Sequence, residues 1–304
     1  MPRFSIILPC YNAEATLADT LRSLVAQTCG DWEALVIDDG STDGTAALIA
    51  EAAEDDARIR LVTHEGKGPS AARNAGAAAA RGEILAFLDA DDLWRPEKLT
   101  CMTRLFSDPE VGATYARIAF FDGTRARSVS APVDGDLTLP MLLGENPVCT
   151  LSNLTVRRDV FMATGGFDET LVQNEDLDWL IRTVGDGHRV AGINRVLVDY
   201  RTSVSGLSSD LAALREGRRA ALQSAARYGF DVRPWEEAIY LRYLARRALR
   251  IGAPPSEALS LALKGCLQSP RGWFSDMRRG ALTLAGALAA PMLPDALRRS
   301  LFAC

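Results

Sequence analysis

The sequence predicts an α/β domain whose mostly parallel sheet is covered by helices on both faces, followed by a smaller helical region. Short apolar, β-branched segments alternate with segments of helical spacing in the first part of the chain, and this alternation is typical of parallel strands joined by crossover helices. After residue 209 the composition changes to alanine, leucine and arginine in helical patterns interrupted by proline. We therefore place the α/β domain at residues 1–209 and the helical region at residues 210–304.

Each expected element rests on the period of its apolar residues. The first four strands are expected at residues 4–8, 34–37, 59–62 and 84–88, with helices at residues 13–26, 45–53 and 70–80 between them. Further along we expect a helix near residues 96–106, strands near 113–120 and 151–156, a helix at 159–164 and a last pair of strands within 189–200. A polar loop is expected at residues 128–136, and Asn174 is placed to cap one more helix.

The composition limits the partners and the compartment. The chain has 304 residues and a formal net charge of −5, from 34 basic and 39 acidic residues, so it lacks the basic surface of a nucleic-acid-binding protein. Its six cysteines include no Cys-x-x-Cys pair, which fits a reducing cytoplasm. The longest weakly polar stretch, residues 281–293, is too short to span a bilayer, and the first apolar segment has the length of a strand. We therefore expect neither a transmembrane helix nor a signal peptide.

Acidic residues gather at three places, which are Asp38-Asp39 after the second expected strand, residues 89–92 after the fourth, and Glu175-Asp176 at a helix start. Ligands of open α/β sheets bind at the carboxyl ends of the strands. Crowding carboxylates there is costly unless a cation or a set of hydrogen-bond donors is present, and Mg²⁺ or Mn²⁺ takes such oxygen ligands. The sequence thus predicts a divalent metal site at residues 89–92. The alternative is a run that caps the next helix and faces solvent.

The other polar segments also have two interpretations. Residues 39–44 form a typical turn and helix cap, but capping leaves the doubled Asp38-Asp39 unexplained, and a carboxylate there can accept the N–H of a uracil-like base. The loop at residues 66–70 leads into a helix that carries Arg73 near its start, a favourable place for an anion. For Glu175-Asp176 the alternative role is to match the helix dipole.

Six segments occur in one order along the chain: SIILPCYNAE (5–14), LVIDDGST (35–42), GPSAARNAG (68–76), RGEILAFLDADDLW (81–94), GGFD (165–168) and NEDLD (174–178). With these segments in this order, the chain resembles a family 2 glycosyltransferase of the GT-A fold, a Rossmann-like α/β architecture. The resemblance assigns a role to each matching residue. It implies a nucleotide pocket lined by Pro9, Tyr11, Asn12 and Glu14, with Asp39 on the base, Arg73 on the base or diphosphate, and Asp89 on the ribose or diphosphate.

The remaining implied roles concern the reaction itself. Asp91 would bind the metal, Mn²⁺ or Mg²⁺, with Asp92 in support. Asp176 would be the catalytic base, and Glu175 is the alternative for that role. The implied activity is that of an inverting, metal-dependent hexosyltransferase. It would move a sugar from a nucleotide-sugar donor, expected to be UDP-linked, to a hydroxyl of a sugar or lipid-linked acceptor in cell-envelope, exopolysaccharide or glycolipid synthesis.

Two other functions compete with this one. A sugar nucleotidyltransferase should carry a glycine-rich basic loop after the first strand, where this chain has Pro-Cys-Tyr-Asn at residues 9–12. A catalytically silent protein that binds a sugar nucleotide or tethers a partner should have lost an acidic cluster, and all three are present.

The last two features are the histidines and the helical tail. Some relatives place a metal-binding histidine late in the domain, but none follows Tyr200-Arg201 here, and we expect His64 and His188 to be structural or surface residues. The tail mixes arginines with apolar residues such as Trp273 and Leu282. Such a segment either packs as an ordinary helical layer or lies on an anionic membrane surface close to a lipid-linked acceptor. We therefore expect a cytoplasmic protein, with peripheral attachment to the cytoplasmic membrane face as the second possibility.

Overall fold

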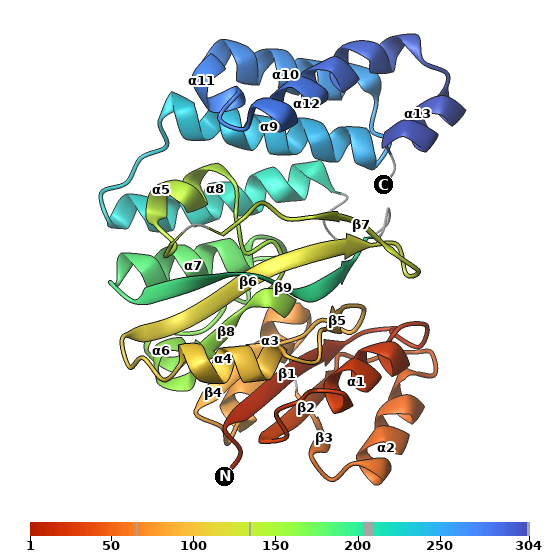
Figure 1. Cartoon of the computed structure of the whole chain (residues 1–304), viewed down its shortest axis with the longest axis vertical. Coiled ribbons are helices and arrows are strands. Elements are labelled where there is room, and N and C mark those ends of the chain that lie inside the picture. The colour runs from red at the N-terminus through yellow and green to blue at the C-terminus, as the bar shows by residue number, and fades with distance from the viewer. Residues whose placement is uncertain (65, 134, 203–209, 303–304) are drawn as a thin grey trace. The chain divides into compact units, whose positions relative to one another are not determined.

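The chain folds into two compact units (Figure 1). The computed structural model describes residues 1–302 except residues 65, 134 and 203–209. The first unit consists of Met1–Leu137 and Val148–Arg201, and the second of Thr138–Pro147 and Thr202–Cys304. The short segment Thr138–Pro147 therefore groups with the helical unit although it lies inside the α/β sequence. From its serine and threonine content a loop is expected at the domain boundary, residues 201–209; Arg201 instead ends β9, and residues 203–209 lie outside the described residues.

The first half of the α/β unit is a parallel sheet with crossover helices, as predicted. Its strands are β1 (Phe4–Cys10), β2 (Trp32–Asp38), β3 (Ile59–Val62) and β4 (Ile84–Phe87), in the order β3-β2-β1-β4. The connecting helices are α1 (Leu17–Val25), α2 (Thr45–Asp55) and α3 (Pro69–Ala79). Because all four strands run in parallel, their carboxyl ends and the loops that follow them lie at one edge of the sheet.

Helices cover both faces of this sheet, as the sequence predicted. Side chains alternate along a strand, so Ile6 and Leu8 of β1 pack in one cluster with Leu17 of α1. On the other face, α3 approaches so closely that a Cβ at Gly76 would lie 2.7 Å from side-chain atoms of Ile7 and Ile37. A larger residue at Gly76 would push α3 away from the sheet. Burial on both faces explains why β1 and β2 are almost continuously apolar.

The second half of the sheet is mixed. Its elements are β5 (Leu93–Trp94), α4 (Lys98–Leu105), β6 (Val111–Phe121), β7 (Ala126–Val129), η1 (Leu151–Asn153), β8 (Thr155–Arg157), α6 (Arg158–Ala163), α7 (Glu175–Gly185) and β9 (Arg189–Arg201). The order continues β4-β8-β6-β9-β5, with β7 beside β6. β8 runs antiparallel to β4 and β6, whereas β6 and β9 are parallel.

Four details of the sequence prediction were wrong or incomplete here. The expected pair of strands at residues 189–200 is one long strand, β9, whose pairing with β6 shifts register between Ala116 and Ile118. The expected strand at 151–156 begins with the 3₁₀ turn η1, and β7 occupies the start of the expected polar loop. Asn174 does stand at the start of α7, but it adopts a left-handed conformation and its side chain makes no capping hydrogen bond.

The second unit is helical. It contains α5 (Leu139–Gly144), α8 (Leu211–Arg227), α9 (Pro234–Arg250), α10 (Pro255–Gln268), α11 (Pro270–Trp273), α12 (Met277–Ala289), η3 (Ala290–Met292) and α13 (Asp295–Phe302). Three helices begin with proline, the residue that tolerates the first helical position best. Its core is built around Trp273 with Leu244 of α9 and Leu261 of α10. Among the described residues, no helix combines the length and the apolar character needed to cross a membrane.

Candidate active site

Two loops at the carboxyl ends of β1 and β2 are tied together by the residues predicted to line a nucleotide pocket. The Asn12 side-chain oxygen accepts a hydrogen bond from the Thr42 N–H at 2.8 Å, and the Asn12 N–H donates to Ser41 Oγ at 2.9 Å. Glu14 Oε2 accepts from the Gly44 N–H at 3.0 Å. Asn12 and Glu14 thus shape the wall of the predicted pocket. Beside them Pro9 is partly buried in β1, and the Tyr11 ring is 63% exposed and available to a ligand.

Asp39 stands where β2 ends, held from two sides. Its Oδ2 accepts a hydrogen bond of 2.8 Å from the Gly68 N–H, which Gly68 can present because it adopts a φ of 90° just before α3. His64 Nε2 lies 3.3 Å from the other oxygen, Oδ1. Sequence reasoning treated His64 only as a structural or surface residue and missed this contact, because nothing local in the sequence links the end of β3 to the end of β2.

Arg73 joins two of the three acidic clusters. It lies on α3 and is only 6% exposed. Its Nη2 donates to Asp89 Oδ1 at 2.6 Å and its Nη1 donates to Glu175 Oε1 at 3.0 Å. Its Nε is buried and has no hydrogen-bond partner among the described residues. A buried guanidinium whose Nε has no partner in the described part of the chain, beside a carboxylate cluster, is suited to an added anionic ligand.

Burial and mutual repulsion raise the pKa values of the acidic groups around Arg73. Burial, with a contribution from Asp89, raises the pKa of Asp91 to about 6. Burial also raises the pKa of Glu175 to about 7, against the lowering effect of Arg73. The pKa of Asp176 is raised, again chiefly by burial. Perturbed carboxyl groups gathered at one edge of an α/β sheet are typical of a functional site.

Asp92 has a supporting position. It is fully buried, and burial together with Asp91 and Asp89 raises its pKa well above the ordinary value. One of its oxygens accepts a hydrogen bond from the Arg201 N–H at 2.8 Å, and the other accepts from Thr150 Oγ1 at 3.3 Å. Arg201 Nε in turn donates to the Asp91 carbonyl at 2.8 Å. Sequence reasoning searched this segment only for a histidine and missed Arg201, which fixes the backbone of the acidic loop from the end of β9.

The acidic loop suits a hard divalent cation. Within the described residues no three acidic, histidine or cysteine side chains converge on one point in metal-binding geometry. Mg²⁺ and Mn²⁺ are, however, commonly held by one or two carboxylates together with substrate phosphates. Burial and the neighbouring Asp89 disfavour the charged form of Asp91 and raise its pKa, and a bound cation would offset both effects. The donor set therefore fits a metal shared between Asp91 and a ligand.

The segments GGFD (165–168) and NEDLD (174–178) are held in place by side-chain hydrogen bonds from α3 and α7. Asn74 of α3 donates from Nδ2 to the Phe167 carbonyl at 2.8 Å and accepts from the Phe167 N–H at 3.0 Å. Arg182 of α7 pairs with Asp178 at 2.8 Å and donates to the Gly166 carbonyl at 2.7 Å. These contacts fix the turn that precedes α7. They thereby place the first turn of α7, with Glu175 and Asp176, beside Arg73.

With this geometry described, comparison with known proteins decides the family. The model of glycosyl transferase family 2 matches residues 5–165, more than half of the chain. The chain belongs to this family. Family membership supports glycosyltransferase activity over nucleotidyl transfer, and it confirms the resemblance seen in the six sequence segments.

Curated relatives include three from bacteria. Escherichia coli WfgD, a UDP-Glc:α-D-GlcNAc-diphosphoundecaprenol β-1,3-glucosyltransferase, is 31% identical over 212 residues, which are 68% of this chain and 79% of WfgD. TuaG of Bacillus subtilis, a putative teichuronic acid biosynthesis glycosyltransferase, is 28% identical over 69% of this chain and 82% of its own. A glycosyltransferase of Nostoc is 34% identical over 166 residues, 52% of each chain. Relatives of this family member thus include enzymes of polysaccharide and glycolipid synthesis.

Solved structures confirm the fold. S. aureus TarS 1-349 superposes with a TM-score of 0.62 at 17% identity, covering 95% of this chain and 92% of that one. A mannosyltransferase from Pyrobaculum calidifontis, solved with GDP-Man and Mn²⁺, gives a TM-score of 0.55 at 22% identity and covers 97% of this chain and 78% of its own. The GT-A-like α/β architecture with a helical C-terminal region is therefore shown.

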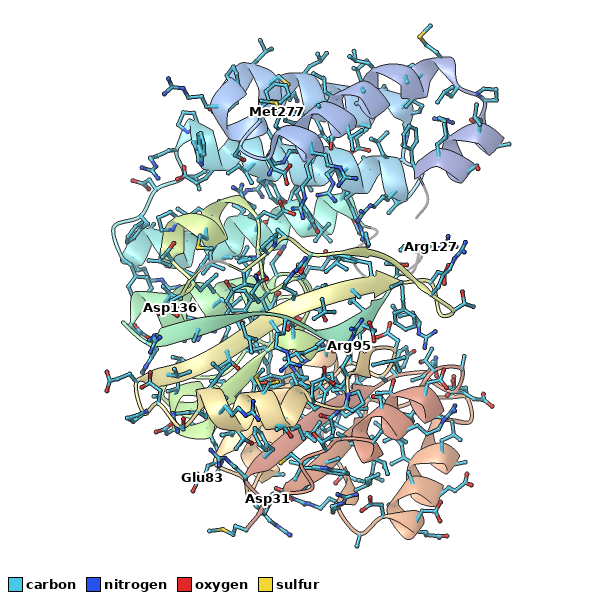
Figure 2. All side chains as sticks on the ribbon, in the orientation of Figure 1. Asp31, Glu83, Arg95, Arg127, Asp136 and Met277 are labelled. Carbon is cyan, nitrogen blue, oxygen red and sulfur yellow. The ribbon has the colours of Figure 1, made fainter. Side chains whose placement is uncertain are left out.

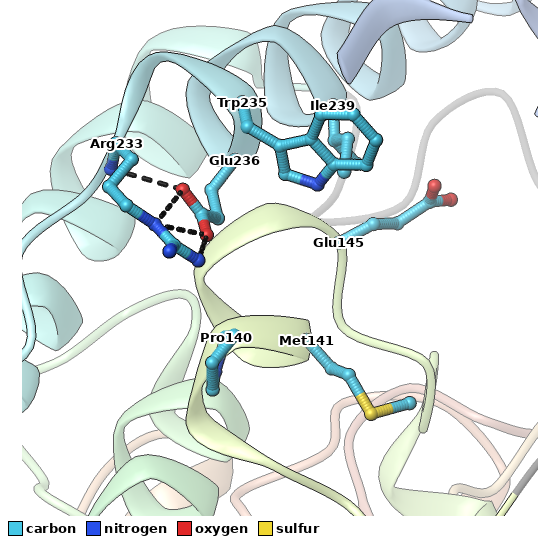
Figure 3. Close-up of a pocket in the computed structure, with 7 residues that line it drawn as sticks. All are labelled: Pro140, Met141, Glu145, Arg233, Trp235, Glu236 and Ile239. Carbon is cyan, nitrogen blue, oxygen red and sulfur yellow. Dashed lines mark hydrogen bonds and ion pairs between the residues drawn. The ribbon is translucent and has the colours of Figure 1, made fainter. Parts of the chain in front are cut away.

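The helical unit has a hollow of its own, of about 310 Å³, that contains none of the predicted site residues (Figure 3). It lies between the start of α9 and the α5 segment. Its lining consists of Pro140, Met141, Glu145, Arg233, Trp235, Glu236 and Ile239. Arg233 and Glu236 are paired with each other as the cap of α9. Because its polar groups are used in this way, the hollow offers no counterpart of the carboxylate site in the α/β unit.

Proposed function

We propose that the protein is an inverting, metal-dependent glycosyltransferase that uses a UDP-linked sugar. The observation that carries the proposal is the buried Arg73 bridge, which holds Asp89 and Glu175 on one guanidinium beside Asp91 and Asp176. This arrangement supplies in one place a cation-binding carboxylate, a donor for an anionic leaving group and a candidate base. Those are the parts that displacement of a nucleoside diphosphate requires.

The donor site is proposed at the ends of β1, β2 and β4. Asp39 would accept a base N–H, since each carboxylate oxygen has a second lone pair beyond its bond to Gly68 or His64. UDP is favoured by the printed descriptions of similar proteins, because WfgD uses UDP-Glc and TarS was solved with UDP and with UDP-GlcNAc. Arg73, through its unused Nε, would face the diphosphate.

In the proposed mechanism an acceptor hydroxyl attacks the anomeric carbon from the face opposite the leaving diphosphate, so the configuration inverts. Asp176 takes the hydroxyl proton as the new bond forms. A base is needed because a neutral hydroxyl is a weak nucleophile. Mn²⁺ or Mg²⁺, held by Asp91, would offset the charge that develops on the diphosphate. Glu175 holds Arg73 in place, because its carboxylate is occupied by Nη1 at 3.0 Å.

The acceptor is proposed to be a sugar attached to a lipid diphosphate. WfgD acts on a diphosphoundecaprenol-linked sugar, and TuaG and the Rhizobium meliloti relative ExoO are named for teichuronic acid and succinoglycan biosynthesis. An acceptor of this kind would place the reaction at the cytoplasmic face of a membrane. We propose that the helical unit helps to bind the acceptor.

The experiment compares Asp176→Asn with Glu175→Gln in single-turnover transfer and in calorimetric donor binding. Asp176→Asn should lower transfer by about 10²-fold or more, the loss expected for a general base, with little change in the donor Kd. Glu175→Gln keeps an oxygen that accepts from Arg73, so its transfer should fall much less. Equal or greater loss in Glu175→Gln would move the base to Glu175. If the unaltered protein binds donor but transfers nothing to any acceptor, it is a silent binding protein instead.

A further inference from the structure

Three helices of the second unit pack on one side of α9. A Cβ at Gly265 of α10 would lie 3.2 Å from Leu241 Cβ of α9, and a Cβ at Gly286 of α12 would lie 3.2 Å from Leu249 Cδ1 of the same helix. The Trp273 ring of α11 lies against Gly265 of α10, and its Nε1 donates a hydrogen bond of 3.1 Å to the Gly280 carbonyl of α12. The opposite sides of α10 and α12 therefore face away from α9 and form the outer surface of this layer.

That outer surface is apolar on α12 and mixed on α10, where Leu263 and Leu267 stand among exposed polar residues. On α12 the exposed positions are Met277, Arg278, Ala281, Leu282, Ala285 and Leu288, of which only Arg278 is polar. Large exposed side chains continue on the neighbouring elements, with Leu263 and Leu267 on α10 and Met292 on η3. Leu267 and Met292 are 84% and 85% exposed. The outward face of a surface helix normally carries polar residues. An exposed apolar face of this kind marks a surface that contacts a membrane or another protein.

We call six of these residues the apolar face: Leu263, Leu267, Met277, Leu282, Leu288 and Met292. Figure 2 labels Met277 at the start of α12. Beside Met277 the surface continues into a hollow of about 470 Å³, lined by Trp235, Phe274 and Met277 with Arg271 at its edge. The apolar face is thus extended by a recess with aromatic walls.

Basic side chains accompany the apolar face. Lys264, Arg271 and Arg278 are exposed, and among the described residues none of the three has an ion-pair partner. The nearby acidic groups are already paired, because Glu257 faces Arg215 at 3.6 Å and Asp276 faces Arg279 at 3.2 Å. The surface around the apolar face therefore carries net positive charge.

We propose that the apolar face is the surface by which this protein lies on an anionic lipid bilayer. Apolar side chains on amphipathic helices enter the interface between headgroups and acyl chains, while Lys and Arg meet lipid phosphates. Charge favours this occupant over a second copy of the chain, because pairing two such faces would bring like-charged Lys264, Arg271 and Arg278 together. The proposal rests on the proposed function in one respect, since a lipid-linked acceptor is met at a membrane.

The test is co-sedimentation of the full chain with vesicles of phosphatidylglycerol and phosphatidylcholine, beside vesicles of phosphatidylcholine alone. We expect binding to the anionic vesicles that weakens as salt is added, because the charges are exposed and screened. The double variant Leu282→Glu, Leu288→Glu should lower the bound fraction at least tenfold. Leu61→Glu is the matched control, because Leu61 in β3 and Leu288 are both 52% exposed. This control should bind vesicles like the unaltered protein.

Two outcomes would overturn the proposal. One is vesicle binding that the double variant leaves unchanged. The other is a protein that does not bind anionic vesicles; if its light-scattering mass in solution also shows a dimer that the double variant dissociates, the apolar face belongs to a second copy. UDP binding in vesicle-free solution is measured on the same samples. A protein that binds vesicles but no nucleotide would refute the proposed function, whereas one that binds nucleotide but no vesicles would refute only the membrane surface.

Discussion

Replacing Arg73 by methionine removes the guanidinium that bridges Asp89 and Glu175 and keeps much of the apolar stem. Both carboxylates lose a donor at 2.6 and 3.0 Å, in a place where Arg73 is 6% exposed. Removing one partner of a buried ion pair costs about 3–5 kcal/mol of folding free energy, because the other charge stays buried without compensation. We expect a loss in that range at neutral pH, together with much weaker donor binding.

The same variant should show a defined pH dependence. The pKa of Glu175 is already raised by burial to about 7, from an ordinary 4.5, and Arg73 is the strongest influence that lowers it. Without Arg73 that pKa rises further. A carboxyl group whose folded pKa exceeds its unfolded value favours the folded state at low pH, and this advantage is lost as the pH rises. The destabilisation should therefore be largest above about pH 7 and shrink toward about pH 5.

Urea unfolding at several pH values measures this effect, with the change in midpoint and the slope recorded for each variant. Arg22→Met is the control, because Arg22 and its partner Asp19 are 76% and 45% exposed. A surface pair of this kind contributes about 1 kcal/mol or less. Either of two results would refute this interpretation: Arg73→Met lowers the free energy of unfolding no more than Arg22→Met does, or the loss in Arg73→Met does not vary with pH. Arg73 would then not compensate buried charge on Asp89 and Glu175.

Two further predictions concern the metal and a buried lysine. UDP with Mn²⁺ or Mg²⁺ should stabilise the protein by about 2.7 kcal/mol when UDP is present at about 100 times its Kd. Excess chelator, or the variant Asp91→Asn, should abolish the resulting increase in Tm. An equal increase in Tm in the presence of chelator would rule out a cation shared between Asp91 and UDP. Burial lowers the pKa of Lys98 from 10.5 to about 7, so the unfolded chain holds a proton that the folded protein releases, and stability should rise with pH between these values. Lys98→Met should remove that rise, about 5 kcal/mol for the full shift, as measured by the difference between the two proteins in urea unfolding. Parallel curves would show that the pKa of Lys98 is not perturbed.

Local patterns were sufficient for much of the fold. The four parallel strands and the helices between them could be predicted because each is a short apolar segment whose period differs from that of its neighbours. Prediction failed where the signal was not local. The sequence prediction divided this segment into two strands, but pairing with β6 on one side and β5 on the other keeps Arg189–Arg201 in one strand.

The candidate site divides in the same way. Asp39, Asp89, Asp91, Glu175 and Asp176 could be selected from sequence because carboxylates at strand and helix ends stand out. Arg73 could be selected because it follows a glycine-containing loop near a helix start. The contacts of His64 with Asp39 and of Arg201 with Asp91 could not be, because they join residues far apart in the chain. No pattern within either segment reports the other, so only the folded backbone reveals these pairs.

The sequence by itself determined the family, the parallel half of the sheet and the residue types at its carboxyl edge, because motifs and periodicity are properties of short segments. Tertiary structure decided which of those charged residues lie next to one another and form ion pairs. Arg73 meets Glu175 across 102 residues of chain, and that meeting is possible because Asn74 and Arg182 hold the turn before α7 against α3. Burial, which sets the pKa values of Asp91 and Glu175, likewise depends on packing from many segments and is absent from any one of them.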